Sequence, residues 1–272
     1  MSYICPICRA ALHFDASGLS CPAGHRFDRA REGYVNLLPV QKKKSKDPGD
    51  NKEMMLARRS FLDAGYYEFL SQRVGELALE YAPSSHSVLD LGCGEGYYSS
   101  RLHKRLSAAS GDVNMYGLDI SRAALKYAAR RYQQIHFCVA SSYDMPFEDQ
   151  TFDLMLRIYA PSKADELARV MRPGGILITV SPGKTHHYAL KQMIYEQPRY
   201  HEAKHEVLPG FEPVHQENLT SLLQLPAGDM VLHFLEMTPY AWKFSNEAKN
   251  TLAQAPLTCE LDFFIQIHRK QK

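Results

Sequence analysis

The chain has 272 residues with a net charge of +2, and 45% of its residues are hydrophobic. This composition is ordinary for a soluble globular protein, and the length allows one large domain together with a small one. No apolar stretch approaches the roughly 18 residues that a membrane span requires, and the N-terminus lacks a signal-peptide pattern. We therefore expect a cytoplasmic protein without a membrane partner, whose six cysteines are thiols or metal ligands rather than disulfides.

The positive charge is concentrated at the N-terminal end. Residues 1–60 contain eleven Lys or Arg and six Asp or Glu, a net charge of +5, which leaves −3 for the other 212 residues. A basic end on a near-neutral body is typical of a protein that meets a polyanion with that end. A merely solvated basic segment has the same charge, so this pattern alone does not separate the two interpretations.

The first motif along the chain is a set of metal ligands. Cys5, Cys8, Cys21 and His25 follow the pattern C-x2-C-x12-C-x3-H, which supplies the three thiolates and one imidazole of a tetrahedral structural zinc site. His13 is an alternative fourth ligand, although His25 has the better spacing. Because about thirty residues cannot bury a self-sufficient core, the zinc ion would supply much of the folding free energy of this module.

A basic linker is predicted to follow the zinc module. The mixed polar and aromatic segment 27–39 is expected to be extended and to complete the module, which we place at residues 1–38. Residues 39–53 then form an exposed linker. Its lysines are suited to neutralise phosphates, and beside a zinc module we favour nucleic acid as their partner, with a plain linker as the alternative. These lysines are Lys42, Lys43, Lys44 and Lys46.

Residues 54–272 are predicted to form the catalytic domain. Helical spacing of apolar residues runs from Glu53 to Tyr81, and Gly65 divides it into two helices. A buried parallel strand, 88–91, leads into three glycines at alternate positions, Gly92, Gly94 and Gly96. Glycines let the backbone approach a ligand closely, and the next helix points its free N–H groups at this loop. The combination predicts a site for a nucleotide-type cofactor.

Asp90 discriminates between such cofactors. The loop has the spacing G-x-G-x-G rather than the G-x-G-x-x-G of dinucleotide-binding proteins. Asp90 stands two residues before the first glycine, where its carboxylate would repel a pyrophosphate and attract an ammonium or sulfonium group. We therefore expect S-adenosylmethionine rather than NAD. A plain strand-to-helix turn with chance glycines is the alternative.

Strands and helices alternate through the middle of the chain. After a helix at 98–106, strands are expected at 115–121, 135–140, 152–158 and 176–180, with helices at 122–132 and 165–171. This order predicts an α/β fold with a doubly wound, mostly parallel sheet that binds ligands at the carboxyl ends of its strands. Asp119 ends the second strand 23 residues after Gly96, near the position from which an acidic residue accepts hydrogen bonds from ribose hydroxyls.

The C-terminal third is predicted to add an insertion and two antiparallel strands. Residues 183–216 are rich in Tyr, His and Lys, and this insertion can cover the active-site mouth, bind RNA or be a decorative helix and loop. A strand at 217–225, helices at 230–243 and 247–255, and a last strand at 259–268 are expected to follow. Trp242, the only tryptophan, is predicted to lie in the core rather than to serve as a stacking platform.

Four segments together resemble the successive motifs of class I S-adenosylmethionine-dependent methyltransferases, which have a Rossmann-like fold. In that superfamily an acidic residue five places before the proline of the third segment often contacts the adenine amine. Ser141 occupies that place here, so the resemblance implies that Ser141, Ser142, Tyr143 or the backbone takes this role. The four segments are Asp90 to Gly96, Asp119, Met145 to Phe147 and Arg169 to Gly175.

A more specific resemblance runs from Cys5 to about Pro182. The zinc pattern and segments 32–41, 47–50, 58–65 and 157–161 resemble the 23S ribosomal RNA guanine-N1 methyltransferases, and the similarity continues weakly through 237–240. Members methylate a guanine in one hairpin loop of the large-subunit RNA. The resemblance implies a homodimer, a zinc domain that helps to hold RNA, and cofactor contacts at Tyr67, Gly94, Glu95 and His186. Spacing alone favours packing for Tyr67.

The implied reaction, methylation at guanine N1, requires a catalytic group close to the guanine base. N1 carries a proton at neutral pH, so a base near N1, or a donor at O6 that stabilises the developing enolate, is expected. At the end of the fourth strand, Arg157 is suited to donate to O6 and Tyr159 to stack on the guanine. A structural ion pair for Arg157 and loop packing for Tyr159 are the alternatives. Two other functions fit the same motifs: a small-molecule methyltransferase with an appended zinc module, and a non-catalytic RNA-binding protein that senses the cofactor.

Overall fold

The computed structural model describes residues 3–15, 18–42, 51–202 and 206–272. Three of the lysines predicted to neutralise phosphates, Lys43, Lys44 and Lys46, lie outside these residues, and Lys42 closes the short 3-10 helix η1 (Val40–Lys42). No helix in the described part of the chain is long and apolar enough to cross a membrane.

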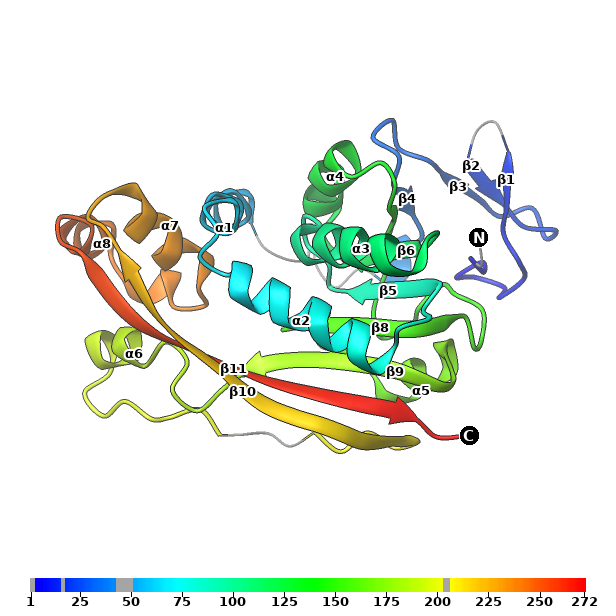
Figure 1. Cartoon of the computed structure of the whole chain (residues 1–272). Coiled ribbons are helices and arrows are strands. Elements are labelled where there is room, and N and C mark those ends of the chain that lie inside the picture. The colour runs from blue at the N-terminus through cyan, green and yellow to red at the C-terminus, as the bar shows by residue number, and fades with distance from the viewer. Residues whose placement is uncertain (1–2, 16–17, 43–50, 203–205) are drawn as a thin grey trace.

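The centre of the molecule is an eight-stranded sheet with the order β10-β11-β9-β8-β5-β6-β7-β4 (Figure 1). The strands from β4 to β9 pair in parallel, whereas β11 is antiparallel to both β9 and β10. This confirms the predicted α/β fold. The strands are β4 (Val35–Asn36), β5 (Ser87–Leu91), β6 (Asn114–Asp119), β7 (His136–Val139), β8 (Phe152–Ile158), β9 (Met171–Pro182), β10 (Phe211–Leu225) and β11 (Leu257–Lys270).

The strand order changes direction at β5. From β5 the chain proceeds to β6 and β7 on one side, then crosses to β8 and β9 on the other. In doubly wound folds the crevice outside the carboxyl ends of the strands at such a switch point is the preferred place for a ligand. The glycine loop follows β5 directly, so the fold puts it in this crevice.

Both faces of the sheet are covered, which is why the central strands are apolar throughout. Alternate side chains enter different cores: Val88 packs with residues of α2, α3 and α4, and Leu89 with residues of α5 and the N-terminal module. Gly65, with a φ of +87°, separates α1 from α2 as predicted. The helices are α1 (Lys52–Asp63), α2 (Glu68–Tyr81), α3 (Tyr97–Ser110), α4 (Arg122–Arg131), α5 (Ala164–Val170), α6 (Tyr188–Ile194), α7 (Asp229–Met237) and α8 (Asn246–Leu252).

The N-terminal module is tied to the large sheet. It has an antiparallel sheet of its own, formed by β1 (His13–Asp15), β2 (Gly18–Ser20) and β3 (Arg26–Asp28). Beyond it, β4 pairs with β7, and Tyr3 stacks on Phe147 with 5.3 Å between the ring centroids. The segment predicted to complete the zinc module therefore also supplies an edge strand of the catalytic sheet.

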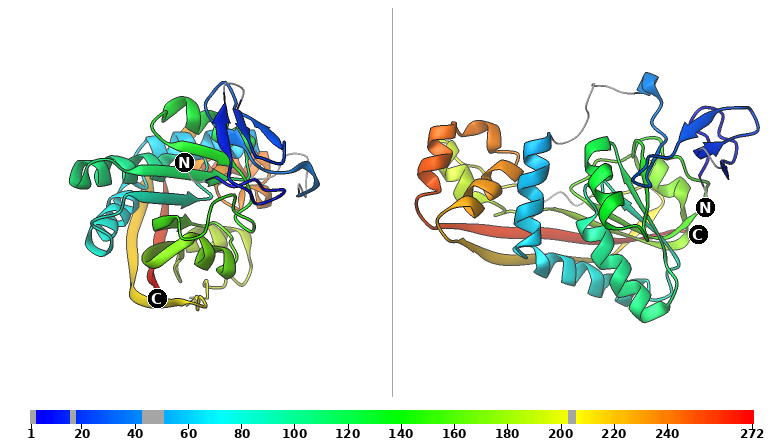
Figure 2. Two further views of the ribbon diagram at one scale, coloured as in Figure 1. Left: turned by 90° about the vertical axis from the view of Figure 1, so that its right-hand side faces the viewer. Right: turned by 90° about the horizontal axis from the view of Figure 1, so that it is seen from above.

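The long pair β10 and β11 connects the sheet to a lobe formed by α6, α7 and α8 at the end of the molecule opposite the N-terminal module (Figures 1 and 2). In this lobe the predicted helix 230–243 is interrupted. Helix α7 ends at Met237, and a separate 3-10 helix, η2 (Ala241–Lys243), follows. Pro239 disfavours a helical conformation at the residue before it, and Thr238 is extended with a ψ of 156°.

Two further predictions from the sequence differ from the structure. Trp242, on η2, is 74% exposed, so its predicted position in the core is wrong. It was counted as part of a continuous amphipathic helix that Pro239 does not allow. Strand β9 begins at Met171 rather than at residue 176, and Met171 pairs with Phe152 before the register shifts.

Candidate active site and metal centre

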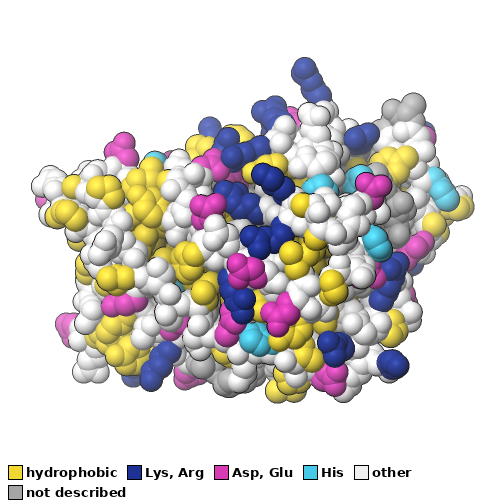
Figure 3. Space-filling model, in the orientation of Figure 1, with side chains coloured by type: hydrophobic (Ala, Val, Ile, Leu, Met, Phe, Trp, Pro, Cys, Tyr) yellow, Lys and Arg dark blue, Asp and Glu magenta, His cyan; other side chains and the backbone are white. Residues whose placement is uncertain are grey.

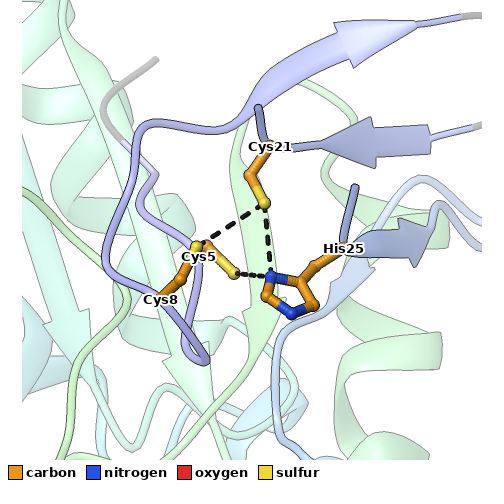
Figure 4. Close-up of side chains that lie close together, drawn as sticks. All are labelled: Cys5, Cys8, Cys21 and His25. Atoms are coloured by element: carbon orange, nitrogen blue, oxygen red, sulfur yellow. Dashed lines mark hydrogen bonds between the residues drawn. The ribbon is translucent and has the colours of Figure 1, made fainter. Parts of the chain in front are cut away.

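The N-terminal module brings four potential metal ligands together (Figure 4). The donor atoms of Cys5, Cys8, Cys21 and His25 all lie within 4.8 Å of one another. His25 Nδ1 lies 3.5 Å from Cys5 Sγ and 3.4 Å from Cys21 Sγ, and the sulfur atoms of Cys8 and Cys21 are 3.6 Å apart. These spacings suit the edges of a tetrahedron around zinc, with Zn–S of about 2.3 Å and Zn–N of about 2.0 Å. His13, the alternative ligand, is exposed on β1 and lies outside this cluster.

The glycine loop after β5 has the backbone that its sequence predicts. Gly92, Gly94 and Gly96 have φ values of +69°, +54° and +83°, a region that other residues rarely adopt. A Cβ atom on Gly92 would lie 2.5 Å from the Cβ of Ala160, so that glycine is also needed for close packing. A Cβ on Gly94 would meet no atom within 4 Å. The loop therefore leaves open space beside Gly94.

Asp119 holds this loop in place from the carboxyl end of β6. Its carboxylate accepts hydrogen bonds from the backbone N–H groups of Gly94 at 2.8 Å and Ser121 at 2.7 Å. Burial raises the pKa of Asp119, and these backbone donors oppose that effect. Because each carboxylate oxygen can accept more than one hydrogen bond, Asp119 can orient the loop and still receive ribose hydroxyls.

Asp90 is a buried acid beneath the loop. It is 2% exposed, and Ser99 Oγ donates a hydrogen bond to it at 2.6 Å. Burial raises the pKa of Asp90 to about 7. A positively charged ligand in the adjoining space would stabilise the ionised form, as the charge argument from the sequence requires.

Glu95 and Arg58 of α1 complete this wall, and Arg59 of the same helix lies close to Glu95. Burial raises the pKa of Glu95 to about 7, although Arg59, 3.7 Å away, lowers it. Arg58 is half-buried and donates a hydrogen bond to the carbonyl oxygen of Met237 at 3.2 Å. Sequence reasoning did not single out either arginine as a site residue. The only signal was their position in segment 58–65, which contributes to the family resemblance.

These groups border one cavity of about 510 Å³ at the carboxyl ends of β5, β6 and β8. That volume is in the range of about 300–1,000 Å³ found for small-molecule sites. Every residue predicted to contact the cofactor borders the cavity except Gly96, which starts α3 beside it. Ser141 is among them, and so are Ser142 and Tyr143. The insertion contributes His186, His187 and His201 to the opposite wall.

Two tyrosine–histidine pairs stand on that opposite wall. Tyr159 Oη lies 3.3 Å from His186 Nε2, and Tyr67 Oη lies 3.0 Å from His187 Nε2. The two imidazole rings stack with their centroids 3.8 Å apart. Tyr67 thus packs against Phe61 and Phe263, as its spacing suggests. It also borders the cavity in which the family resemblance implies a contact with the cofactor.

The hydrogen bonds of His186 fix its tautomer. The backbone N–H of Asp262 donates to Nδ1 of His186 at 3.1 Å, so the proton of the neutral ring resides on Nε2 and is donated to Tyr159. Burial lowers the pKa of His186 to about 3, and a tyrosine hydroxyl such as that of Tyr159 ordinarily loses its proton only near pH 10. The pair is therefore neutral at physiological pH. Tyr159 also has a φ of +54°, a strained conformation that is typical of functional positions.

Arg157 has a different environment. It is buried, forms an ion pair with Glu206, and donates to Ser162 Oγ at 2.8 Å. The cavity wall, as far as the structure describes it, does not include Arg157. These contacts favour the structural alternative for Arg157, while Tyr159 borders the cavity directly.

Known protein families match both the N-terminal module with its metal ligands and the domain that contains the cavity. The family profile of the N-terminal domain of RlmA, a zinc ribbon, matches residues 3–46, and a methyltransferase domain profile matches residues 83–229. A Streptomyces fradiae protein, the 23S rRNA (guanine(748)-N(1))-methyltransferase, is 32% identical over 93% of this chain and 90% of its own length. The chain belongs to the 23S rRNA (guanine-N1)-methyltransferase family. Both predicted cofactors of this methyltransferase, S-adenosylmethionine and a structural zinc ion, are thereby confirmed.

Two other relatives show how far each similarity extends. A Micromonospora griseorubida protein, provisionally named a 23S rRNA (guanine-N(1)-)-methyltransferase, is 31% identical over 88% of the chain and 86% of its own length. A Mycobacterium ulcerans phthiotriol/phenolphthiotriol dimycocerosates methyltransferase is 35% identical, but over only 35% of this methyltransferase and 37% of its own length. Similarity to that small-molecule enzyme is confined to a part of the chain.

Proposed function

We propose that this methyltransferase transfers the methyl group of S-adenosylmethionine to N1 of a guanine in a hairpin loop of 23S ribosomal RNA. The observation that carries the proposal is the one cavity that both the glycine loop and the Tyr159–His186 pair border. One wall suits the methyl donor, and the other offers an aromatic ring and a hydroxyl to a base. The similarity over nearly the whole chain to the Streptomyces fradiae enzyme supports the same acceptor.

The cofactor contacts are also part of the proposal. We assign Asp119 to the ribose hydroxyls, Asp90 to the positively charged end of the cofactor, and Ser141 to the adenine side. Bound S-adenosylmethionine supplies an electrophilic methyl group on its sulfonium, and the protein's task is to align the guanine with it. The remaining members of the site are Tyr67, Gly92, Gly94, Glu95, Gly96 and His186.

Tyr159 is the group that we propose to act on the guanine. Because Nε2–H of His186 donates to Tyr159 Oη, the hydroxyl hydrogen of Tyr159 is not used by His186 and is left for a ligand in the cavity that Tyr159 borders. There it can donate to guanine O6 and stabilise the negative charge that develops as N1 loses its proton. An unpaired loop guanine can enter such a pocket with little unstacking cost.

The same geometry argues against His186 as the base at N1. Its Nδ1 already accepts the N–H of Asp262, and its Nε2 carries the only ring proton. We therefore assign His186 to the positioning of Tyr159, and Arg157 to the ion pair with Glu206.

The test is a methylation assay with purified protein, a hairpin from 23S ribosomal RNA and cofactor labelled in its methyl group. We expect 1-methylguanine as the labelled nucleoside, and label found only at other atoms would contradict the proposal. A non-catalytic RNA-binding protein would bind cofactor and RNA without forming product. A small-molecule methyltransferase would leave the RNA unlabelled. Sedimentation of the same protein tests the homodimer, which we propose from the family resemblance alone.

The zinc ligands are tested by substitution in the module. Cys8→Ser should abolish the zinc content and unfold the N-terminal module, because three ligands cannot close the tetrahedral site. His13→Ala is the matched control and should retain one zinc ion per chain. Elemental analysis measures the zinc content of both variants, and an unchanged zinc content in Cys8→Ser would refute this ligand set.

A further inference from the structure

Three exposed aromatic residues and two lysines lie beside residues that border the cavity, either as near neighbours along the chain or through contacts with one another. We call Lys184, Tyr195, Tyr200, Trp242 and Lys243 the aromatic rim. The exposed fractions are 74% for Trp242, 51% for Tyr200 and 40% for Tyr195, which are high values for large aromatic side chains. None of the five is needed for the reaction described above, so their exposure calls for a separate explanation.

The rim has two halves, and each is joined to a residue that borders the cavity. Lys243 Nζ lies 4.1 Å from the centre of the Trp242 ring and 5.7 Å from that of Tyr195. Trp242 and Lys243 follow Tyr240 along the chain, and Tyr240 borders the cavity. In the other half, Lys184 Nζ lies 5.3 Å from the centre of the Tyr200 ring, and the next residue, His201, borders the cavity.

The lysines of the rim differ from several basic residues elsewhere on the surface. Figure 3 shows Lys and Arg side chains gathered over the middle of one face. Among the arginines of the protein, Arg131 pairs with Asp63 and Arg130 with Glu32, so their charges are balanced within the protein. Neither Lys184 nor Lys243 forms an ion pair with a carboxylate in the part of the chain that the structure describes. Their charges remain available to an anionic ligand.

We propose that the aromatic rim binds unpaired nucleotides on either side of the target guanine, by stacking their bases on Trp242, Tyr195 and Tyr200 while Lys243 and Lys184 contact their phosphates. Aromatic faces interleaved with cations are the way in which proteins hold single-stranded nucleic acid. A second copy of the chain is a poorer occupant, because docking it there would bury unpaired ammonium groups. The inference rests on RNA being the substrate, as proposed above.

Trp242 makes this testable, because it is the only tryptophan in the chain. Its fluorescence therefore reports on the rim alone. A short RNA hairpin with guanines in its loop should quench the fluorescence in parallel with binding measured by the anisotropy of labelled RNA. A blunt duplex with the same number of phosphates should not quench it, because its bases are already stacked.

Substitutions in the rim can show whether a loss of RNA binding comes from lost base stacking, from lost charge or from misfolding. Trp242→Ala should weaken hairpin binding by about five- to a hundredfold, the usual range for the loss of one stacked base, whereas Trp242→Phe should retain most of the affinity. Lys243→Gln should reduce the number of counterions released on RNA binding by about one, which is measured as a shallower slope of log affinity against log salt concentration. Lys270→Gln is the matched control, since Lys270 also lies over an aromatic ring, 5.5 Å from the centre of Phe211, at the far end of the β10–β11 pair. Cofactor affinity should be unchanged in all four variants.

The outcomes distinguish this inference from the proposed function. If the wild-type protein neither binds nor methylates the hairpin, the proposed function fails and the inference fails with it. If it methylates the hairpin while the fluorescence of Trp242 stays constant, only the inference is overturned. A Trp242→Ala variant that binds RNA normally but sediments as a smaller species would show that the rim is instead a contact between copies of the chain.

Discussion

The two walls of the cavity are built in different ways. Most of the residues that we assign to the cofactor wall lie in a short stretch of chain, 90–119, which is held in place by backbone hydrogen bonds such as the one from Gly94 to Asp119. The wall that we assign to the acceptor is centred on Tyr159 and includes His186, His187 and Tyr67, which are distant in sequence and held to one another by side chains. Two of these residues, Tyr67 and His186, are also proposed cofactor contacts. Changes around Gly94 should therefore alter cofactor binding, and changes at Tyr159 should alter the rate of methyl transfer.

The largest effect should come from Tyr159→Phe. Loss of one hydrogen-bond donor to a developing oxyanion typically lowers kcat by about 10²- to 10³-fold. The phenyl ring keeps the packing of Tyr159, so the dissociation constant of S-adenosylmethionine should change by less than about twofold. Single-turnover assays and cofactor titrations measure the two quantities separately.

Tyr143→Phe is the matched control for that change. Tyr143 borders the same cavity, and Tyr143 and Tyr159 are each 45% exposed. No hydrogen bond in the described structure links the Tyr143 hydroxyl to a histidine, so this variant should keep a rate near that of the wild type. A drop in cofactor affinity in Tyr159→Phe, with an unchanged rate of transfer, would instead place Tyr159 on the cofactor wall.

A smaller effect on activity, which acts through cofactor binding and not through the rate of methyl transfer, is expected from Gly94→Ala. Alanine at a φ of +54° costs roughly 1–2 kcal/mol of stability, and the added methyl group would project into the open space beside the loop. Overfilling of that kind costs about 1–3 kcal/mol, so cofactor affinity should fall by about five- to a hundredfold.

Gly174→Ala separates backbone strain from the loss of space. Gly174 has a φ of +79°, and a Cβ atom there would meet no atom within 4 Å, but this glycine does not border the cavity. Thermal unfolding should show a similar destabilisation for the two variants. Calorimetric titration should show weakened cofactor binding for Gly94→Ala alone. Equal cofactor affinity in the two variants would mean that the loop does not approach the cofactor.

The same division explains what the sequence could predict. The glycine loop, Asp90 and Asp119 are local in sequence, and their chemistry follows from residue type and spacing. The zinc ligands are local as well. The acceptor wall depends on how distant segments pack, so Tyr67 and His186 were indicated by the family resemblance rather than by spacing, and the Tyr159–His186 hydrogen bond was not predicted at all.

The features that the sequence did not predict correctly also depend on how distant segments pack. The pairing of β4 with β7 joins residues 35–36 to 138–139, and no local pattern indicates it. Trp242 was misplaced because apolar spacing was extended through Pro239. Arg58 was missed because an arginine on a helix is ordinarily a surface residue, whereas here the helix borders a buried cavity. Local chemistry thus predicts the methyl donor, and the environment of the acceptor has to be read from the fold.

The smallest expected effect is a pH dependence that belongs to the cofactor wall. In the protein without cofactor, burial raises the pKa values of Asp90 and Glu95 to about 7. A positively charged ligand favours the ionised carboxylates, so both pKa values should be lower in the complex than in the free protein. Binding should therefore be strongest above pH 7 and weaken as the pH falls below it, by up to about tenfold per pH unit for each linked carboxylate.

Calorimetric titrations at pH 6 and pH 8, in buffers with different ionisation enthalpies, measure this linkage as protons released on binding. Asp90→Asn should release fewer protons and show a shallower pH dependence. S-adenosylhomocysteine lacks the sulfonium charge and keeps the ammonium group, so it should do the same with the wild-type protein where the acids respond to the sulfonium, and should match S-adenosylmethionine where they respond to the ammonium. Equal affinity of S-adenosylmethionine at the two pH values would mean that neither acid faces its positive charge. Methyl transfer measured at saturating cofactor should stay insensitive to these two acids, because the Tyr159–His186 pair on the other wall is neutral throughout this pH range.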